Sequence, residues 1–253
     1  MAEHTKYQIF KLFVDDTNHP FSGWDFSYIR DRMVTEPFTW SYSSEILPYV
    51  RTVDSMLDMG TGGGEFLLSI LPLPRNTHAT ESYEPNIPVA RRNLEPIGVK
   101  VIEFTDENSL PIEDEKFDLI INRHESYSVK EVKRILKKNG YFITQQVGAK
   151  NDLELNQLIK AKLDLDYAHW NMDYAVKELT DAGFTIIKKM ECFPKTRCFD
   201  IGAIIFYLKV IPWQIPDFSI EKYQTKLKDI HLLIHEKGYI DITSHYFLIV
   251  AKK

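Results

Sequence analysis

Short apolar segments alternate with segments of helical period from residue 53 onward, and this alternation restricts the chain to few folds. Strands that alternate with helices are typical of βαβ units, which build a largely parallel sheet. The predicted strands are Ser55 to Met59, Thr77 to Ser82, Val99 to Phe104, Phe117 to Asn122, Tyr141 to Val147, Thr185 to Cys192 and His245 to Ala251. Seven strands are enough for a doubly wound α/β sheet.

The segments between these strands carry apolar stripes at helical spacing, and each stripe is expected to pack on the sheet. The stripes are Ile87, Ala90, Leu94 and Ile97; Val129, Val132 and Leu136; and Met172, Ala175, Val176 and Leu179. Gly98, Gly140 and Gly183 follow these segments directly, where a left-handed residue often closes a helix. The glycine positions therefore agree with the periodicity.

Two regions lie outside the alternation and are expected to be additions to one domain. Residues 1–50 are rich in aromatic side chains and form a predicted cap, which either covers the core or overhangs a pocket. The main domain is predicted over residues 51–253. It includes an insertion at about residues 197–240, with an amphipathic segment from Ile220 to Ile234.

Charge and cysteine content restrict the partners and the compartment. The chain of 253 residues has 31 basic and 36 acidic residues, a net charge of −5, so nucleic acid is an open but disfavoured partner. Cys192 and Cys198 support neither a disulfide framework nor a four-ligand zinc site, and no metal site is predicted. Because we find no secretory pattern and no run of ~20 apolar residues, we expect a cytoplasmic protein without membrane contact. The oligomeric state stays open.

The first predicted strand runs directly into a glycine-rich turn, which reads LDMGTGGGEFL from Leu57 to Leu67. Glycine permits a sharp turn and a close approach of the backbone to a ligand, and the following helix offers unpaired N–H groups. The turn is either a cofactor cradle or a tight connection between strand and helix.

Acidic side chains follow the next two strands. Glu81 comes 81 − 60 = 21 residues after Gly60, close to the ~20-residue offset of ribose-binding acids in nucleotide-binding folds. Its alternative role is a solvated charge, and the nearby Tyr83 either lies against a purine or packs in the fold. Asp106 follows the third strand, where it either accepts an adenine amine or caps a turn.

From about Thr52 to Val147 the chain resembles the class I S-adenosylmethionine-dependent methyltransferases with a type 11 domain. The motifs are LDMGTGGGEFL, ATESYEPNIPVARRNL and TDENSLPIEDEKFDLI. In one departure, the family's ribose acid often lies three residues before a proline, where this chain has Ser82. The resemblance implies S-adenosylmethionine as cofactor, held by Asp58, Gly60, Thr61, Gly62, Gly64, Glu81, Tyr83, Asp106, Glu107 and Arg123.

The same resemblance implies a Rossmann-like sheet of seven strands sandwiched by helices. Its last strand is antiparallel and lies between the fifth and the sixth, and the C-terminal HYFLIVAKK resembles that strand. A nicotinamide-dependent dehydrogenase fits less well. Its G-x-G-x-x-G fingerprint needs a third glycine where this chain has Glu65 or Leu67.

Methyl transfer from a sulfonium is an in-line displacement, so alignment and exclusion of water supply much of the rate. A base is needed only when the acceptor must lose a proton. His124 is the predicted proton-transfer residue because its ordinary pKa lies near neutrality, and Glu125 is predicted beside it. In the alternative, Arg123, His124 and Glu125 cap the helix that begins near Val129 or pair among themselves at the surface.

Contacts with the methyl acceptor are predicted for aromatic and amide side chains. They are Trp24, Trp40, Gln145, Gln146 and Trp213. Trp24 and Trp40, with Tyr42, form either a lid or part of the core. Of the two glutamines, one is expected in the pocket and the other outside it, because neighbours on a strand face opposite ways.

A small-molecule acceptor is the favoured hypothesis. The chain lacks the Asn/Asp-Pro-Pro-Tyr/Phe motif and the Pro-Cys pair of two nucleic-acid methyltransferase subclasses. The open alternatives are an RNA base methyltransferase and a non-catalytic protein that binds the cofactor. A basic cluster either contacts phosphates or forms a solvated helix face; its members are Lys130, Lys133, Arg134, Lys137 and Lys138.

Overall fold

The structure, a computed structural model, describes residues 10–15, 18–21, 25–163 and 166–253. Its main element is a seven-stranded sheet with the order β4-β3-β2-β5-β6-β10-β7. The strands are β2 (Ser55–Met59), β3 (Asn76–Glu81), β4 (Lys100–Glu103), β5 (Phe117–Arg123), β6 (Leu136–Val147), β7 (Thr185–Cys192) and β10 (Tyr246–Lys252). All seven predicted strands are therefore confirmed. β10 is antiparallel to both of its neighbours, as the resemblance implies.

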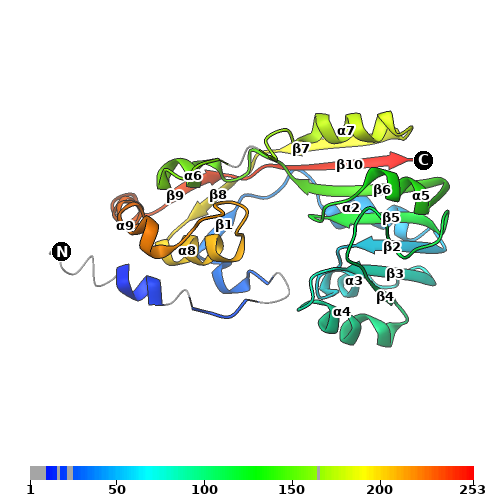
Figure 1. Cartoon of the computed structure of the whole chain (residues 1–253), viewed down its shortest axis with the longest axis horizontal. Coiled ribbons are helices and arrows are strands. Elements are labelled where there is room, and N and C mark those ends of the chain that lie inside the picture. The colour runs from blue at the N-terminus through cyan, green and yellow to red at the C-terminus, as the bar shows by residue number, and fades with distance from the viewer. Residues whose placement is uncertain (1–9, 16–17, 22–24, 164–165) are drawn as a thin grey trace.

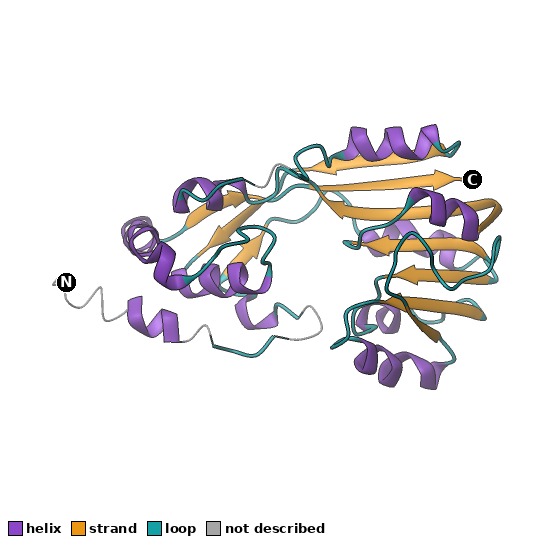
Figure 2. Cartoon of the chain, viewed as in Figure 1, coloured by secondary structure: helices purple, strands orange, loops and turns teal. Residues whose placement is uncertain are grey.

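Helices cover both faces of this sheet (Figure 2). β2 lies near the centre and is buried at every position, which is typical of a strand packed on both faces. One face contacts α2 (Tyr42–Val50), α3 (Glu65–Ser69) and α4 (Ile87–Leu94). The other contacts α5 (Val129–Ile135) and α7 (Met172–Asp181). The fold class predicted from the sequence is thus confirmed.

Three local predictions are wrong. Leu136 begins β6, so it does not belong to the helical stripe of Val129 and Val132. Ile97 does not share the buried face of α4, because α4 ends at Leu94 and the 3₁₀ turn η2 (Glu95–Ile97) leaves Ile97 43% exposed. Gly140 does not close α5, because β6 begins directly after that helix. Asn139 adopts the left-handed conformation there, with φ of 65°, which asparagine tolerates better than most residues.

The N-terminal segment and the insertion share a second sheet, β1-β8-β9. Its strands are β1 (Met33–Thr35), β8 (Lys195–Cys198) and β9 (Ile240–Thr243). With α6 (Leu153–Ile159), α8 (Ile201–Val210) and α9 (Ile220–Lys237), the sheet encloses an apolar core of its own. The short helix η1 (Ser27–Ile29) adds to the packing on α8. Figure 1 shows this group of elements at one end of the large sheet.

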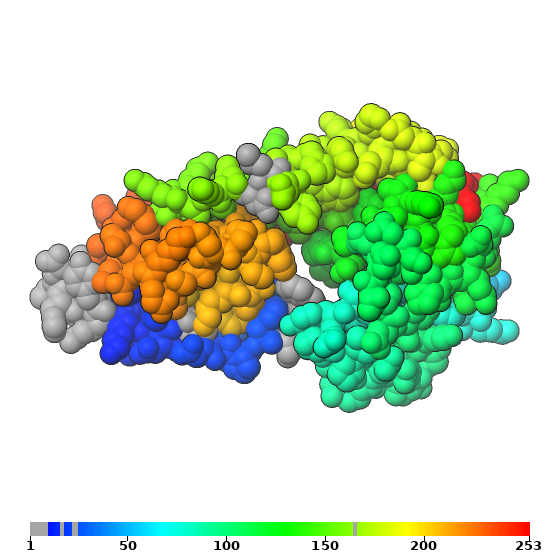
Figure 3. All heavy atoms as spheres, viewed as in Figure 1, coloured from blue at the N-terminus to red at the C-terminus, as the bar shows by residue number. Residues whose placement is uncertain are grey.

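Two stretches of chain run through both sheets. β7 continues into β8, and β9 continues into β10; at the junction the Ser244 N–H donates to the Pro194 carbonyl at 2.9 Å. The carboxyl ends of the parallel strands point toward the small sheet (Figure 1). Figure 3 shows the surface hollowed between the two groups of elements. Within the described ranges, no helix has both the length and the apolar character needed to cross a bilayer.

Candidate functional site

The register of the parallel strands places the predicted site residues side by side. Met59 of β2 pairs with Thr80 of β3 on one side and with Asn122 of β5 on the other. The next residues along these strands are Gly60, Glu81 and Arg123, and Arg123 pairs in turn with Gln145 of β6. Neighbouring strands lie about 5 Å apart, so these residues emerge as one row at the carboxyl edge of the sheet.

The glycine loop is held tightly by its surroundings. Gly60, Gly62 and Gly64 have φ of 70°, 62° and 86°, values that favour glycine. A Cβ atom on Gly64 would lie 2.6 Å from Leu94 of α4, and one on Gly60 would lie 2.5 Å from Cβ and Cγ of Glu125. The loop is therefore packed against α4 on one side and against the Glu125 side chain on the other.

Buried polar atoms near this loop lack partners. The Thr61 side chain is 8% exposed, and its hydroxyl makes no hydrogen bond to the described residues, although it lies near Asp58. Both amide atoms of Asn86, in the turn after β3, are also buried and have no hydrogen-bond partner in the part of the chain that the structure describes. Since most buried polar atoms are paired, this arrangement fits a site that receives a polar ligand.

Glu81 is part of the fold rather than a solvated charge. Its side chain is 4% exposed, and Oε1 accepts the backbone N–H groups of Ser82 at 2.9 Å and Tyr83 at 2.8 Å. These bonds fix the carboxylate at the end of β3. Tyr83 is 55% exposed, so it does not pack in the core. The ribose and purine roles of the two residues stay predictions.

Asp106 caps a turn, because its Oδ1 accepts the Asn108 N–H at 2.9 Å. Its adenine role stays a prediction. Glu107 accepts the Ser126 hydroxyl at 2.5 Å, which links the loop after β4 to the loop after β5. The turn cap was one of the two roles expected for Asp106, whereas the sequence pattern does not suggest the contact between Glu107 and Ser126.

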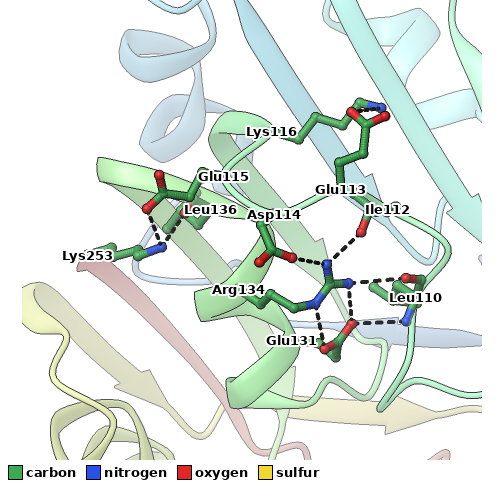
Figure 4. A network of polar contacts seen from close by, with 10 residues as sticks. All are labelled: Leu110, Ile112, Glu113, Asp114, Glu115, Lys116, Glu131, Arg134, Leu136 and Lys253. Atoms are coloured by element: carbon green, nitrogen blue, oxygen red, sulfur yellow. Dashed lines mark hydrogen bonds and ion pairs between the residues drawn. The ribbon is translucent and has the colours of Figure 1, made fainter.

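Arg134 of α5 holds the segment Leu110 to Ile112, which follows Asp106, by hydrogen bonds (Figure 4). Its guanidinium donates to the carbonyls of Leu110 at 3.1 Å and Ile112 at 2.6 Å, and pairs with Glu131 at 2.7 Å. Glu131 also accepts the Leu110 N–H at 3.0 Å. Two other members of the predicted basic cluster are also engaged: Lys133 donates to the Ala182 carbonyl, and Lys137 pairs with Asp118.

Negative charge accumulates along the row. Burial raises the pKa of Glu125 to about 7, and the charges of Glu81 and Glu107 raise it as well. Burial also raises the pKa of Asp58 to about 7; Glu81 adds to this effect and Arg123 opposes it. The Arg123 guanidinium lies 5.8 Å from the Tyr42 ring centre, in cation–π range.

His124 lies in a crowded but solvent-accessible position. Its φ is 62°, and its ring centre is 5.6 Å from that of Tyr246. Desolvation by the surrounding atoms and the charge of Arg123 lower its pKa. Ser128 is the N-cap residue of α5, so Arg123, His124 and Glu125 do not cap this helix, contrary to the alternative considered above.

Both predicted glutamines are buried and support the row. The Trp40 indole donates to Gln145 Oε1 at 2.8 Å, and Gln145 Nε2 lies 3.1 Å from His124 Nε2. Gln146 Nε2 donates to the Glu125 carbonyl at 3.0 Å and to Asn122 Oδ1 at 2.5 Å. The two amides diverge, but neither leaves the site for solvent.

The predicted aromatic contacts have different outcomes. Trp40 and Tyr42 are buried in the main core, where Tyr42 donates to the Asn122 carbonyl, so they do not form an open lid. Trp213 is exposed in the connection between α8 and α9. Trp24 lies outside the described residues. Substrate contact by Trp40 and Trp213 stays a prediction.

The strand order, the single antiparallel strand and the glycine loop define the class I methyltransferase fold. Residues 57–144 match the family model described as "Methyltransferase domain". A provisionally assigned methyltransferase structure from Bacillus halodurans C-125 has a TM-score of 0.59 and 21% identity, covering 85% of this chain and 99% of that chain. Residues 57–144 therefore match a methyltransferase family, and the chain has the class I methyltransferase fold.

Two curated relatives match over part of their length. The uncharacterized methyltransferase YcgJ of Bacillus subtilis is 27% identical over 118 residues, 43% of this chain and 47% of the relative. A ribosomal protein L11 methyltransferase of Staphylococcus saprophyticus is 33% identical over 119 residues, 44% of this chain and 38% of the relative. This chain thus matches less than half the length of either protein.

Replacing Arg134 with methionine should destabilise the protein. The change removes the donor of two backbone carbonyls and the charged partner of the buried Glu131 carboxylate, which keeps the Leu110 N–H, so we expect a loss of about 2 to 3 kcal/mol in the free energy of unfolding. Urea denaturation measures this loss. The control Lys138→Met, at an exposed position, should stay within about 0.5 kcal/mol of wild type. Equal losses in the two variants would contradict the pinning role.

Proposed function

We propose that the protein is an S-adenosylmethionine-dependent methyltransferase that acts on a small-molecule acceptor. The observation that carries this proposal is the row at the carboxyl edge of the sheet. At this row lie a left-handed glycine loop, whose Thr61 hydroxyl makes no hydrogen bond to the described residues, the buried Glu81 and the adjacent carboxyl group of Glu125. A ligand with a ribose and a positive charge matches these three features.

The residues of the row fit the parts of this cofactor. Glu81 has one carboxylate oxygen bound to its own turn, which leaves the other oriented by the fold to accept ribose hydroxyls. Arg123, at the same edge, suits the carboxylate of the methionine moiety. Glu125, packed on Gly60, suits the positive charge of the sulfonium. When bound, the cofactor supplies an electrophilic methyl group.

The charge of the site supports a small acceptor over RNA. Glu81 lies within electrostatic reach of Asp58 and Glu125, and Glu107 lies within reach of Glu125, so a phosphate backbone would be repelled there. The cations of α5 are partly engaged in contacts within the protein, with Arg134 bound to several acceptors. The net charge of −5 adds to this preference.

Methyl-labelled cofactor tests the function directly. The purified protein is incubated with the labelled cofactor and either a metabolite extract or total RNA, and the products are separated by size. We expect label in the small-molecule fraction. Label in RNA would overturn the choice of acceptor, and binding of the cofactor without any transfer would favour the non-catalytic alternative.

Glu81→Gln should weaken cofactor binding while it preserves the fold. The amide oxygen of glutamine still accepts the N–H groups of Ser82 and Tyr83, whereas the charge-assisted bonds to the ribose are lost. We expect an affinity for S-adenosylmethionine about 10- to 100-fold lower by calorimetric titration. Glu84→Gln, in the exposed part of the same turn, is the matched control. Unchanged affinity in Glu81→Gln would refute the ribose role.

The preference for the charged cofactor over its neutral product should depend on Glu125 and on pH. With its raised pKa of about 7, Glu125 is mostly protonated at pH 6 and mostly ionised at pH 8. Ionisation favours the sulfonium, so the ratio of the affinities for S-adenosylmethionine and S-adenosylhomocysteine should rise about 3- to 10-fold over this range. Glu125→Gln should flatten the profile. A ratio that changes equally in wild type and Glu125→Gln would contradict this role.

A further inference from the structure

Three side chains form a chain of hydrogen bonds that determines where His124 carries its proton. The Trp40 indole nitrogen is only a donor, so the Gln145 atom 2.8 Å from it must be the amide oxygen. The Gln145 amide nitrogen then points to His124 Nε2 at 3.1 Å. Because an amide nitrogen only donates, Nε2 must hold a lone pair. The neutral ring therefore carries its proton on Nδ1.

The surroundings keep this orientation fixed. Gln145 is 2% exposed and lies in β6, paired with β5 and β10. Its carbonyl accepts the His124 N–H at 2.8 Å, so the same residue positions both the backbone and the ring of His124. Rotation of the amide would bring its nitrogen against the indole N–H and break the hydrogen bond to Trp40.

The groups around the ring also keep it neutral. The neighbouring charged group on β5 is Arg123, whose charge disfavours a second positive charge on His124. β10 contributes the Tyr246 ring, while β6 and the N-terminal segment contribute the neutral side chains of Gln145 and Trp40. Glu125 follows His124 in the chain, but it packs against Gly60, and its carboxylate makes no hydrogen bond to the His124 ring.

We propose that Trp40 and Gln145 hold His124 as a neutral Nδ1–H donor, which binds an oxygen of the methyl acceptor instead of removing its proton. This inference rests on the proposed methyltransferase function and names its substrate class, a small molecule with an ionised oxygen such as a carboxylate or a phenolate. The oxygen attacks the methyl carbon, and the carbon–sulfur bond breaks with its electron pair on sulfur. No proton has to leave, so the step needs no base.

His124 is then a catalytic residue that contacts the acceptor, and Trp40 and Gln145 are positioning residues. This role differs from the proton transfer predicted from the sequence. A base would need a free lone pair facing the acceptor. In the structure, the lone pair at Nε2 is already occupied by the Gln145 amide.

Nuclear magnetic resonance of the full chain with ¹⁵N-labelled histidine tests the proton position. The His124 signals are assigned by their loss in His124→Asn. We expect a protonated Nδ1, an unprotonated Nε2 and no titration between pH 8 and pH 6. A proton on Nε2, or a titration midpoint between pH 6 and pH 7, would overturn the proposal. The wild-type spectrum is sufficient for this test and does not depend on the stability of any variant.

Gln145→Glu tests the positioning role. A carboxylate only accepts, so Nε2 should become protonated and the midpoint should rise by at least about one pH unit. Trp40→Phe removes the indole donor that orients the Gln145 amide. His124 should then populate both its Nδ1–H and its Nε2–H tautomer. If the ring is unchanged in both folded variants, the hydrogen-bond chain does not position the proton.

Label-transfer rates separate the donor from the base. A donor role predicts that His124→Asn stays within about 10-fold of wild type, because asparagine also donates, while His124→Leu loses more. A base role predicts losses of about 10²- to 10⁴-fold in both variants. If the protein is not a methyltransferase, it should fail to bind the cofactor while His124 still carries its proton on Nδ1. If this inference is wrong, the protein should bind the cofactor normally while His124 carries its proton on Nε2.

Discussion

The register of four parallel strands is the constraint on which the rest of the site depends. Met59 lies level with Thr80 and Asn122, and Asn122 with Thr144, so the residues that follow leave the sheet at one height. A shift of one residue would turn every side chain of a strand to the opposite face. The register therefore brings Gly60, Glu81 and Arg123 together, although 63 residues separate the first from the last along the chain (123 − 60 = 63).

The electrostatic character of the site follows from this convergence. Burial raises the pKa of Asp58 and of Glu125 to about 7, and the nearby charge of Glu81 adds to both shifts. A cationic ligand would relieve this repulsion by favouring the ionised forms. The same carboxylates make the edge unfavourable for polyanions, which connects the cofactor proposal with the proposed class of acceptor.

Local sequence signals predicted much of the fold and of the glycine loop. Strands such as β2 and β7 were found at their observed ends, because continuous or alternating apolar residues are read directly from the chain. Contacts between segments far apart in the sequence were not predicted. β1 has three residues and pairs with β8 more than 150 residues later, and no pattern in either segment predicts that partner (198 − 33 = 165).

Side-chain roles in the site were predictable only where the residue type restricts the chemistry. The acid at Glu81 follows from its offset from the glycine loop, whereas the pinning of the Asp106 turn by Arg134 depends on the path of that turn. The orientation of Gln145 depends on Trp40, which the sequence places over 100 residues away (145 − 40 = 105). Trp40 and Tyr42 therefore act beneath the site, within its supporting core.

The most direct test of the account is an experimental structure of the protein with S-adenosylhomocysteine. We expect the ribose hydroxyls within hydrogen-bond distance of Glu81, the backbone of residues 60–64 against the ligand, and the ligand's sulfur beside Glu125. A ligand bound away from this edge, or a Glu81 carboxylate that turns away from the ribose, would contradict this expectation.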